Sequence, residues 1–133
     1  MDLWSLQVAI KTKLDAQASL VALLNDGVDS IRDDVRTDDA FPYISIHDVS
    51  TKSMDTQTVV GTESLVSIHI YSRYSGNKEL KEIMDEVYVA LNRQPLTLAT
   101  GTHISTLYTN SNNFTESDGF TRHGQINFSI VTE

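Results

Sequence analysis

Four histidines are the residues of this chain best suited to bind a metal or move a proton: His47, His69, His103 and His123. Neutral imidazole is a common metal ligand and titrates near neutral pH. Zinc sites need three or four converging ligands, and no two of these histidines have an HxH or HxxxH spacing. Strand alternation still places His47 and His69 side by side, with Asp48 nearby. Two interpretations follow, a metal site or polar residues on an exposed or interface face of a sheet.

Other groupings point less clearly to chemistry. No Gly-x-Ser-x-Gly elbow is present to hold a nucleophilic serine. Gly119 and Gly124 enclose Phe-Thr-Arg-His, which matches no phosphate-binding loop. A cluster of carboxylates lacks the spacing of an EF-hand, so we expect a solvated acidic loop rather than a cation site at Asp33, Asp34, Asp38 and Asp39. Because the chain has no cysteine, disulfides, thiolate metal sites and cysteine nucleophiles are excluded.

Length and charge limit the classes of protein to which this chain can belong. The chain has 133 residues and a net charge of −8, which indicates one domain. Acidic charge repels nucleic acid and anionic lipid at long range, so we expect no basic DNA-binding groove, although DNA could slide past such a surface. No apolar run approaches the roughly 20 residues of a membrane-spanning helix. The N-terminus lacks a signal-peptide pattern, so we expect synthesis in the cytoplasm.

The segment 63–92 organises the predicted fold. Residues 64–73 alternate between apolar and polar side chains, which predicts a central strand with one dry face. Residues 78–92 change to a helical period, and six apolar side chains form one stripe: Leu80, Ile83, Met84, Val87, Tyr88 and Leu91. A helix with one dry stripe after a strand with one dry face is expected to pack on that sheet.

The remaining elements are shorter. Asp2 is expected to cap a helix that ends at Leu14, and Asp15 to cap a second helix over residues 18–24 that ends at Gly27, unless the two form one bent helix. Strands are expected at 43–49, 96–98, 103–109 with Ile104 inward, and 120–131, with a short edge strand within 28–39. The pattern predicts a single α+β domain, with an antiparallel or mixed β-sheet and helices packed on one face.

Two long segments show no sustained periodicity. Residues 50–62 lie between two predicted strands, which favours either a long hairpin whose outer part leaves the body or a flexible solvent loop. Val59 and Val60, near the end of this segment, favour a contact site. Residues 109–119 are predicted to be a loop, because they are rich in Asn, Ser and Thr around Phe114, and they end in an Asp-Gly hairpin signal.

The sheet face opposite the helix is expected to be polar. Two strands supply its side chains, which are Ser67, His69, Tyr71, Arg73, Asn127 and Ser129. Such a face is too polar for a second core but suits a hydrated protein–protein contact or a lumen. Arg73 also lies between Tyr71 and Tyr74, where a cation–π patch is conceivable. Without further basic residues, that patch does not predict a nucleic-acid platform.

The order and spacing of the segments resemble a known family. They are Phe41-Pro42-Tyr43-Ile44 with His47-Asp48-Val49, Gly61-Thr62-Glu63 opening a strand that ends in Ile70-Tyr71-Ser72-Arg73, a helix ending in Ala90-Leu91, Pro95-Leu96, and Asp118-Gly119 followed by Arg122-His123-Gly124. In this order they resemble the tail completion (tail-to-head joining, or tail terminator) proteins of long-tailed bacteriophages and gene-transfer agents. The resemblance covers nearly the whole chain, and no single motif carries it.

The resemblance implies a structural virion protein without catalysis or cofactor. It implies a small α+β subunit that forms a ring, commonly a hexamer, which caps the tail tube and joins the tail to the head connector while DNA passes through its lumen. The implied partners are further copies of the chain, the tail tube protein and the head completion or connector protein. No specific nucleic-acid binding and no membrane are implied, and the expected location is the head–tail interface of the virion.

Two segments are expected to contact these partners. The tip of the 50–62 hairpin is long, polar and outside the core pattern, so we expect it to meet the tail tube through Lys52, Met54, Asp55, Gln57, Val59 and Val60. The 109–119 segment is expected to meet the connector or a neighbouring subunit through Asn112, Phe114 and Glu116. A competing function is a small ligand- or metal-binding module, or an enzyme, that uses the His47/His69 face.

Overall fold

The computed structural model describes residues 2–34 and 40–133. Its elements follow in the order α1 Leu3–Asp15, α2 Ala18–Val21, the 3-10 helix η1 Gly27–Ser30, β1 Ile31–Arg32, β2 Tyr43–Ser53, β3 Thr62–Ser72, α3 Lys78–Leu91, β4 His103–Thr115 and β5 Arg122–Thr132. The strands form one sheet in the order β1-β2-β3-β5-β4. The β1–β2 pair is parallel and the other pairs are antiparallel. The mixed sheet, the central position of β3 and the edge strand are therefore as predicted.

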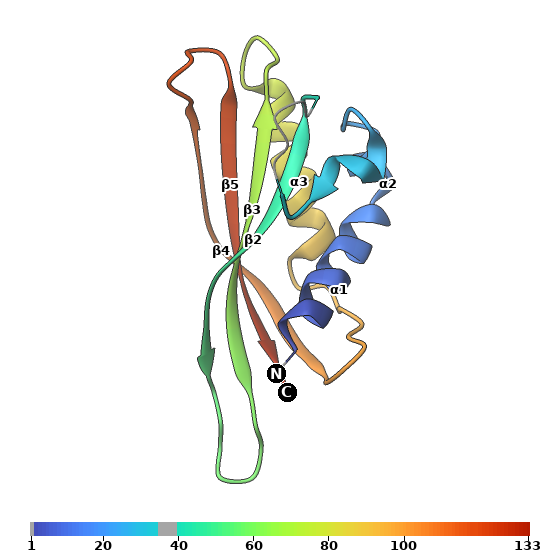
Figure 1. Cartoon of the computed structure of the whole chain (residues 1–133), viewed down its shortest axis with the longest axis vertical. Helices are drawn as coiled ribbons and strands as arrows, with labels where there is room; N and C mark the ends of the chain where they lie inside the picture. The colour runs from blue at the N-terminus through green and yellow to red at the C-terminus, as the bar shows by residue number, and fades with distance from the viewer. Residues whose placement is uncertain (1, 35–39) are drawn as a thin grey trace.

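The helices α1, α2 and α3 lie on one side of the sheet and leave the other side uncovered (Figure 1). Apolar side chains of β3 and β5 face the stripe of α3, and the fully buried ones include Ile68, Ile70, Phe128, Leu80 and Val87. Burying each such side chain contributes about 1.5–3 kcal/mol before chain entropy is subtracted. This confirms the predicted α+β domain with helices on one face. No helix of the described part of the chain is long and apolar enough to cross a bilayer.

Gly124 on β5 explains how closely α3 approaches the sheet. A Cβ atom built at Gly124 would lie 2.7 Å from the Met84 sulfur and 2.9 Å from a methyl carbon of Leu80. Real Cβ atoms do not approach other heavy atoms so closely. The absent side chain therefore gives α3 the space to pack directly on the β5 backbone.

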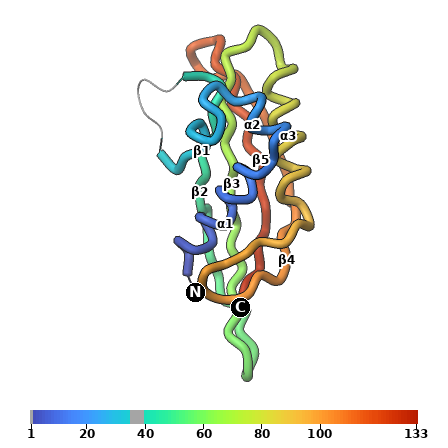
Figure 2. Tube along the Cα trace, turned by 90° about the vertical axis from the view of Figure 1, so that its right-hand side faces the viewer, coloured from blue at the N-terminus to red at the C-terminus, as the bar shows by residue number. Residues whose placement is uncertain are grey.

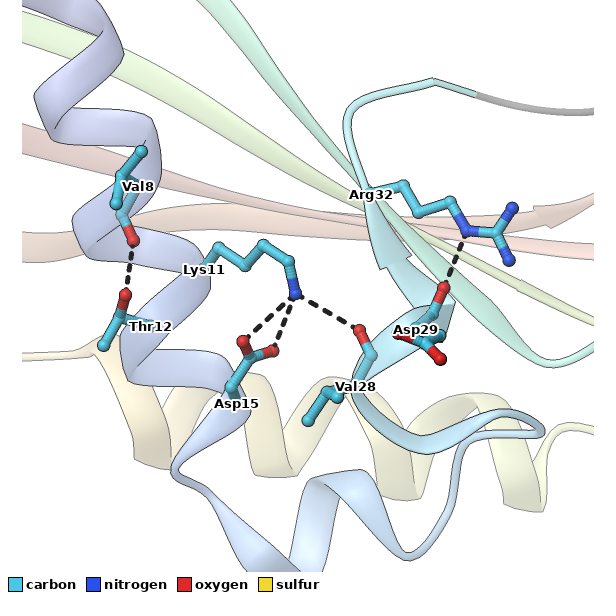
Figure 3. Close-up of polar contacts among 7 residues, drawn as sticks. All are labelled: Val8, Lys11, Thr12, Asp15, Val28, Asp29 and Arg32. Carbon is cyan, nitrogen blue, oxygen red and sulfur yellow. Dashed lines mark hydrogen bonds and ion pairs between the residues drawn. The ribbon is translucent and has the colours of Figure 1, made fainter.

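The N-terminal cap is as predicted, but the second cap is not. The Asp2 carboxylate accepts a hydrogen bond of 3.0 Å from the backbone N–H of Ser5, as an N-cap should. The prediction that Asp15 caps the second helix is wrong, because Asp15 ends α1 and its carboxylate accepts two 3.1 Å hydrogen bonds from Lys11 Nζ (Figure 3). The chain thus forms two separate helices.

The second helix is also shorter than predicted. It spans Ala18–Val21 and begins after Gln17, whereas residues 18–24 were expected. Gly27 does not end this helix; it begins η1 with a left-handed φ of 60°. The interval between α2 and η1 is a series of turns, in which Leu24 is nevertheless buried in the core.

The prediction of a loop at residues 109–119 is wrong. The strand β4 continues to Thr115, which pairs with Arg122 of β5, and the turn begins only at Glu116. The side chains of this outer half are exposed, so no apolar alternation marks it in the sequence. The predicted Asp-Gly turn is present at Asp118 and Gly119, with Gly119 at φ 84°, and β5 starts at Arg122 rather than at residue 120.

Three smaller predictions are also wrong. Residues 96–98 form no strand, although Leu96 is buried in the core as part of an irregular segment. Ile104 is half exposed, because the β4–β5 register shifts between His103 and Ser105. Tyr88 is 42% exposed and lies edge-to-face against Tyr108 rather than in the buried stripe.

Substitutions on α3 test this packing. Val87 is 0% exposed, so Val87→Asp would bury an unpaired charge and should lower the free energy of unfolding by more than about 3 kcal/mol. Glu82 is exposed and forms only a 3.8 Å pair with exposed Lys78, so Glu82→Ala should change the same quantity by less than about 0.5 kcal/mol. Urea unfolding followed by far-UV circular dichroism measures both, and equal midpoints would contradict the packing.

Candidate functional site

The β2–β3 hairpin extends beyond the helices as an arm, defined here as residues 50–64. It projects from one end of the molecule in two perpendicular views (Figures 1 and 2). The two strands pair as far as Ser53 and Thr62, past a register shift between Asp48 and Ser50. This confirms the predicted hairpin and rules out a loop without internal pairing.

The tip of the arm is ordered by its own hydrogen bonds. The backbone N–H of Met54 donates to the carbonyl of Gly61 over 2.8 Å, and that of Thr56 donates to the carbonyl of Val59 over 2.8 Å. The N–H of Gly61 donates to the Asp55 carboxylate over 2.9 Å. A Cβ at Gly61 would lie 2.9 Å from the Met54 carbonyl oxygen, so only glycine fits this position without a shift of the backbone.

The residues predicted to meet the tail tube gather at this tip. All six are exposed: Lys52, Met54, Asp55, Gln57, Val59 and Val60. The apolar members among them face solvent rather than the core. An ordered tip with exposed apolar side chains is typical of a protein contact site.

The opposite end of the sheet carries the β4–β5 turn (Figure 1). Asp118 accepts hydrogen bonds from the backbone N–H groups of Phe120 and Thr121, over 2.9 and 2.8 Å, and from the Thr121 hydroxyl. These bonds, that of the Thr121 hydroxyl first, hold the pKa of Asp118 below its ordinary value. The Arg73 guanidinium lies 4.2 Å from the ring centre of Phe41 and 4.9 Å from that of Phe120. Arg73 therefore stacks on phenylalanines, not on the two tyrosines that flank it in sequence.

The second set of predicted contact residues lies at this end, on the face away from the helices. The ring of Phe114 lies 4.7 Å from that of His123, and Glu116 accepts a 2.8 Å hydrogen bond from His123 Nδ1. Asn112 is paired with Gln125 of β5, and paired residues share a face of the sheet. The structure thus brings Asn112, Phe114 and Glu116 together, although their segment was expected to be a loop.

A row of histidines crosses the uncovered face. The rings of His47 and His69 are 4.8 Å apart, as strand alternation predicted. His123 continues the row, because its Nε2 atom lies 2.7 Å from His69 Nδ1. His123 was not predicted to join this row, although pairing of its strand with the central strand places it beside Tyr71.

The side chains of the histidine row are joined to one another and to their neighbours by hydrogen bonds. His123 donates to the Glu116 carboxylate through Nδ1 and shares a hydrogen bond with His69 through Nε2, while His47 Nε2 lies 2.7 Å from the Ser45 hydroxyl. Among residues 2–34 and 40–133 no group of three or more His, Asp or Glu side chains is placed to hold a metal ion.

The neighbouring rows of this face form an uncharged polar network. Asn127 accepts hydrogen bonds from Ser67 and from Gln125, and its own amide donates to Asn110 over 2.9 Å. Gln125 also donates to the Ser67 hydroxyl over 3.2 Å. Because these polar side chains have hydrogen-bond partners within the protein, they can stay partly buried without a water molecule at every atom.

Two of the four aspartates in the predicted acidic loop lie within the described residues. Asp33 accepts a 2.9 Å hydrogen bond from the Gln7 side chain of α1, and both Asp33 and Asp34 border a groove beside that helix. Asp38 and Asp39 lie outside the described residues.

Acid should destabilise the fold through His69. Partial burial first, and then the neighbouring His123 and His47, lower the pKa of His69 from 6.5 to about 4. The unfolded chain binds this proton at a higher pH than the folded chain does, so stability is complete above about pH 6.5 and falls as the pH is lowered toward about 4. His69→Gln should reduce the loss of Tm between about pH 7.5 and about pH 5. An unchanged loss would show that His69 does not cause it.

Comparison with known proteins places this geometry in a family. The family profile described as Tail completion protein gp17 matches residues 8–133. The tail completion protein gp17 of Bacillus phage SPP1 is 26% identical over 122 residues, which cover 92% of this chain and 87% of that protein.

A solved structure is similar over the same length. One chain in the virion of a native gene transfer agent (GTA) particle superposes with a TM-score of 0.86 and 21% identity, covering 96% of this chain and 94% of that chain. At that identity the likeness concerns the fold. Because the family profile spans all but the first residues, the chain belongs to the family of the tail completion protein gp17, and it is a structural protein of the virion rather than an enzyme.

Proposed function

We propose that copies of this chain form a hexameric ring that caps the tail tube and joins it to the head connector, with DNA passing through the lumen. The observation that supports this most strongly is the position of the two contact segments at opposite ends of one sheet (Figure 1). The arm lies at one end, and the β4–β5 turn with Phe114 and Glu116 lies at the other. A subunit built in this way can hold two different partners along one axis.

The arm is the proposed contact with the tail tube. Its exposed apolar side chains Met54, Val59 and Val60 can bury surface against a partner. Its internal hydrogen bonds mean that little chain entropy is lost on docking. Lys52, Asp55 and Gln57 supply polar contacts around the apolar centre, which is the usual anatomy of a protein interface.

The turn end is the proposed contact with the connector. Phe114 is exposed but held against the His123 ring, and Glu116 is held by the His123 side chain. Asn112 adds a polar side chain on the same face. These positions are fixed by the sheet, so the surface is formed before the partner arrives.

The uncovered sheet face is the proposed lining of the lumen. Its central rows carry Ser, Asn, Gln and His side chains that bond to one another. With no lysine or arginine in these rows and a net charge of −8, such a surface offers no phosphate-binding sites. DNA can then pass through without being held, which agrees with the absence of specific nucleic-acid binding implied by the family resemblance.

Shortening the arm tests the proposed tube contact. Replacing residues 52–60 by a short Gly-Ser turn should leave a folded protein that no longer caps tail tubes, because the exposed side chains of the tip are removed. Electron microscopy of tubes assembled with the variant measures tube length and capping, and circular dichroism confirms folding. Phe114→Ser, at the other end of the sheet, is the matched control and should still cap. Normal capping by the shortened variant would refute the assignment.

A further inference from the structure

Two grooves lie at opposite edges of the sheet, both on the side that the helices cover. The first, of about 370 Å³, lies between α1 and the β1–β2 edge, with Trp4, Val8, Ile31 and Ile46 in its walls. The second, of about 440 Å³, lies between α3 and β4, and its walls include Tyr88, Tyr108, Ser111 and Ile126. We call them the Trp4 groove and the tyrosine groove. Neither takes part in the contacts assigned above.

The two grooves lie at the same level along the strands. Ile46 pairs with Ile68, Ile68 pairs with Ile126, and Ile126 pairs with Ser111. This one row of the sheet starts in the Trp4 groove and ends in the tyrosine groove. A copy of the chain rotated about an axis parallel to the strands therefore brings its Trp4 groove to the level of the tyrosine groove of its neighbour.

The two surfaces have complementary shapes. Trp4 is 67% exposed and Val8 is 45% exposed, so both project from the α1 surface. In the tyrosine groove the rings of Tyr88 and Tyr108 stand edge-to-face with centres 5.3 Å apart. Their hydroxyls are anchored by Asn92 and Ser111 over 3.0 and 2.9 Å. A projecting indole facing a groove with fixed aromatic walls is the arrangement that supplies most energy at protein interfaces.

Strand direction and charge are also compatible with a second copy. β2 and β4 run antiparallel within one chain, so the β4 edge of one copy meets the β2 edge of the next in the favourable antiparallel sense. β4 carries no Lys, Arg, Asp or Glu in its whole length, although charges usually protect an exposed edge strand. The charges around both grooves are nearly balanced, so the two surfaces can face each other without strong repulsion. Lys81 and Asp85 border the tyrosine groove, and the Trp4 groove is bordered by Lys11, Asp15, Arg32, Asp33 and Asp34.

The edges themselves favour a contact between side chains rather than a continuous backbone ladder. Asn92 accepts a 2.9 Å hydrogen bond from the backbone N–H of Tyr108, and the N–H of Arg93 donates to the Thr106 carbonyl. At the other edge, β1 already pairs with Ile44 and its neighbour on β2. The polar rim of the Trp4 groove is ordered as well, since Lys11 bonds to Asp15 and to the Val28 carbonyl (Figure 3).

We infer that Trp4 of one copy docks into the tyrosine groove of the next copy, against the paired rings of Tyr88 and Tyr108, and forms the main subunit contact of the ring. This inference rests on the proposed ring and adds the surfaces that close it. The contact is heterologous, because one copy supplies the Trp4 groove and the other the tyrosine groove, and repetition of such a contact by a closing rotation makes a ring. The uncovered sheet face then remains free for the lumen.

Trp4→Ala is the direct test. Because Trp4 is exposed in the single chain, the variant should fold with a nearly unchanged Tm. Its self-association constant, measured by sedimentation equilibrium or by light scattering over a concentration series, should fall by roughly thirtyfold or more, as at other interface hot spots. Tyr74→Ala removes another exposed aromatic side chain that borders neither groove and should associate like the parent chain. Equal association of Trp4→Ala and the parent would overturn the inference.

Cross-linking separates this inference from the proposed ring itself. The chain has no cysteine, so the double variant Val8→Cys/Ser111→Cys should give a disulfide ladder on oxidation, in concentrated solution or bound to tail tubes. Each single variant should stop at the dimer or below. Tubes capped by rings without a ladder would overturn the Trp4 contact and leave the ring intact. Tubes that stay uncapped by the parent chain would refute the ring, and the contact with it.

The single tryptophan gives an independent reading of the same contact. Its emission should move to shorter wavelength as the parent chain associates, because the indole leaves water. Tyr88→Ala should remove this shift at equal concentration. A ring that forms with the emission unchanged contradicts the inference.

Discussion

The packing of α3 on the apolar side of β3 and β5 is the constraint on which the other features of the structure depend. The stripe of α3 meets alternate residues of the two strands, and the missing side chain of Gly124 lets the helix lie close to the sheet. Since a strand turns successive side chains to opposite faces, burying one set sends the other set to the uncovered side. The position of the core therefore decides where the polar surface lies.

The uncovered side must stay polar without a second layer, and the molecule achieves this with side chains that bond to one another. The Ser67, Gln125 and Asn127 network and the histidine row replace many bonds to water with bonds within the protein. An apolar surface on this side would favour aggregation. A charged surface would bind DNA or repel it strongly. A neutral, internally bonded face avoids both outcomes, which is consistent with the proposed lining of a DNA-conducting lumen.

Strong periodicity explains what could be predicted from the sequence, and its absence explains what could not. The α3 stripe, the central strand, the hairpin and the proximity of His47 and His69 follow from apolar alternation and helical spacing. The outer half of β4 gave no such signal, because its side chains are exposed on both faces and only its backbone ladder with β5 defines it. Tyr88 was predicted to be buried but is partly exposed. Helical spacing alone shows which side chains share a face, but not where the sheet beneath α3 ends. The Trp4 groove needs the tertiary contact of α1 with β1, which no local pattern reveals.

Register connects these surfaces with one another. The buried row Ile46, Ile68 and Ile126 fixes how the strands align, and a slip by one residue would turn every core side chain toward the uncovered side. The same alignment places His123 beside His69, the arm at one end, the β4–β5 turn at the other, and Ser111 level with Ile46. Selection for a well-packed core therefore also preserves the spacing between the proposed tube, connector and neighbour contacts. In the proposed ring, copies of one rigid register would present each kind of contact at one height, which suits the flat contact with a tube end proposed above.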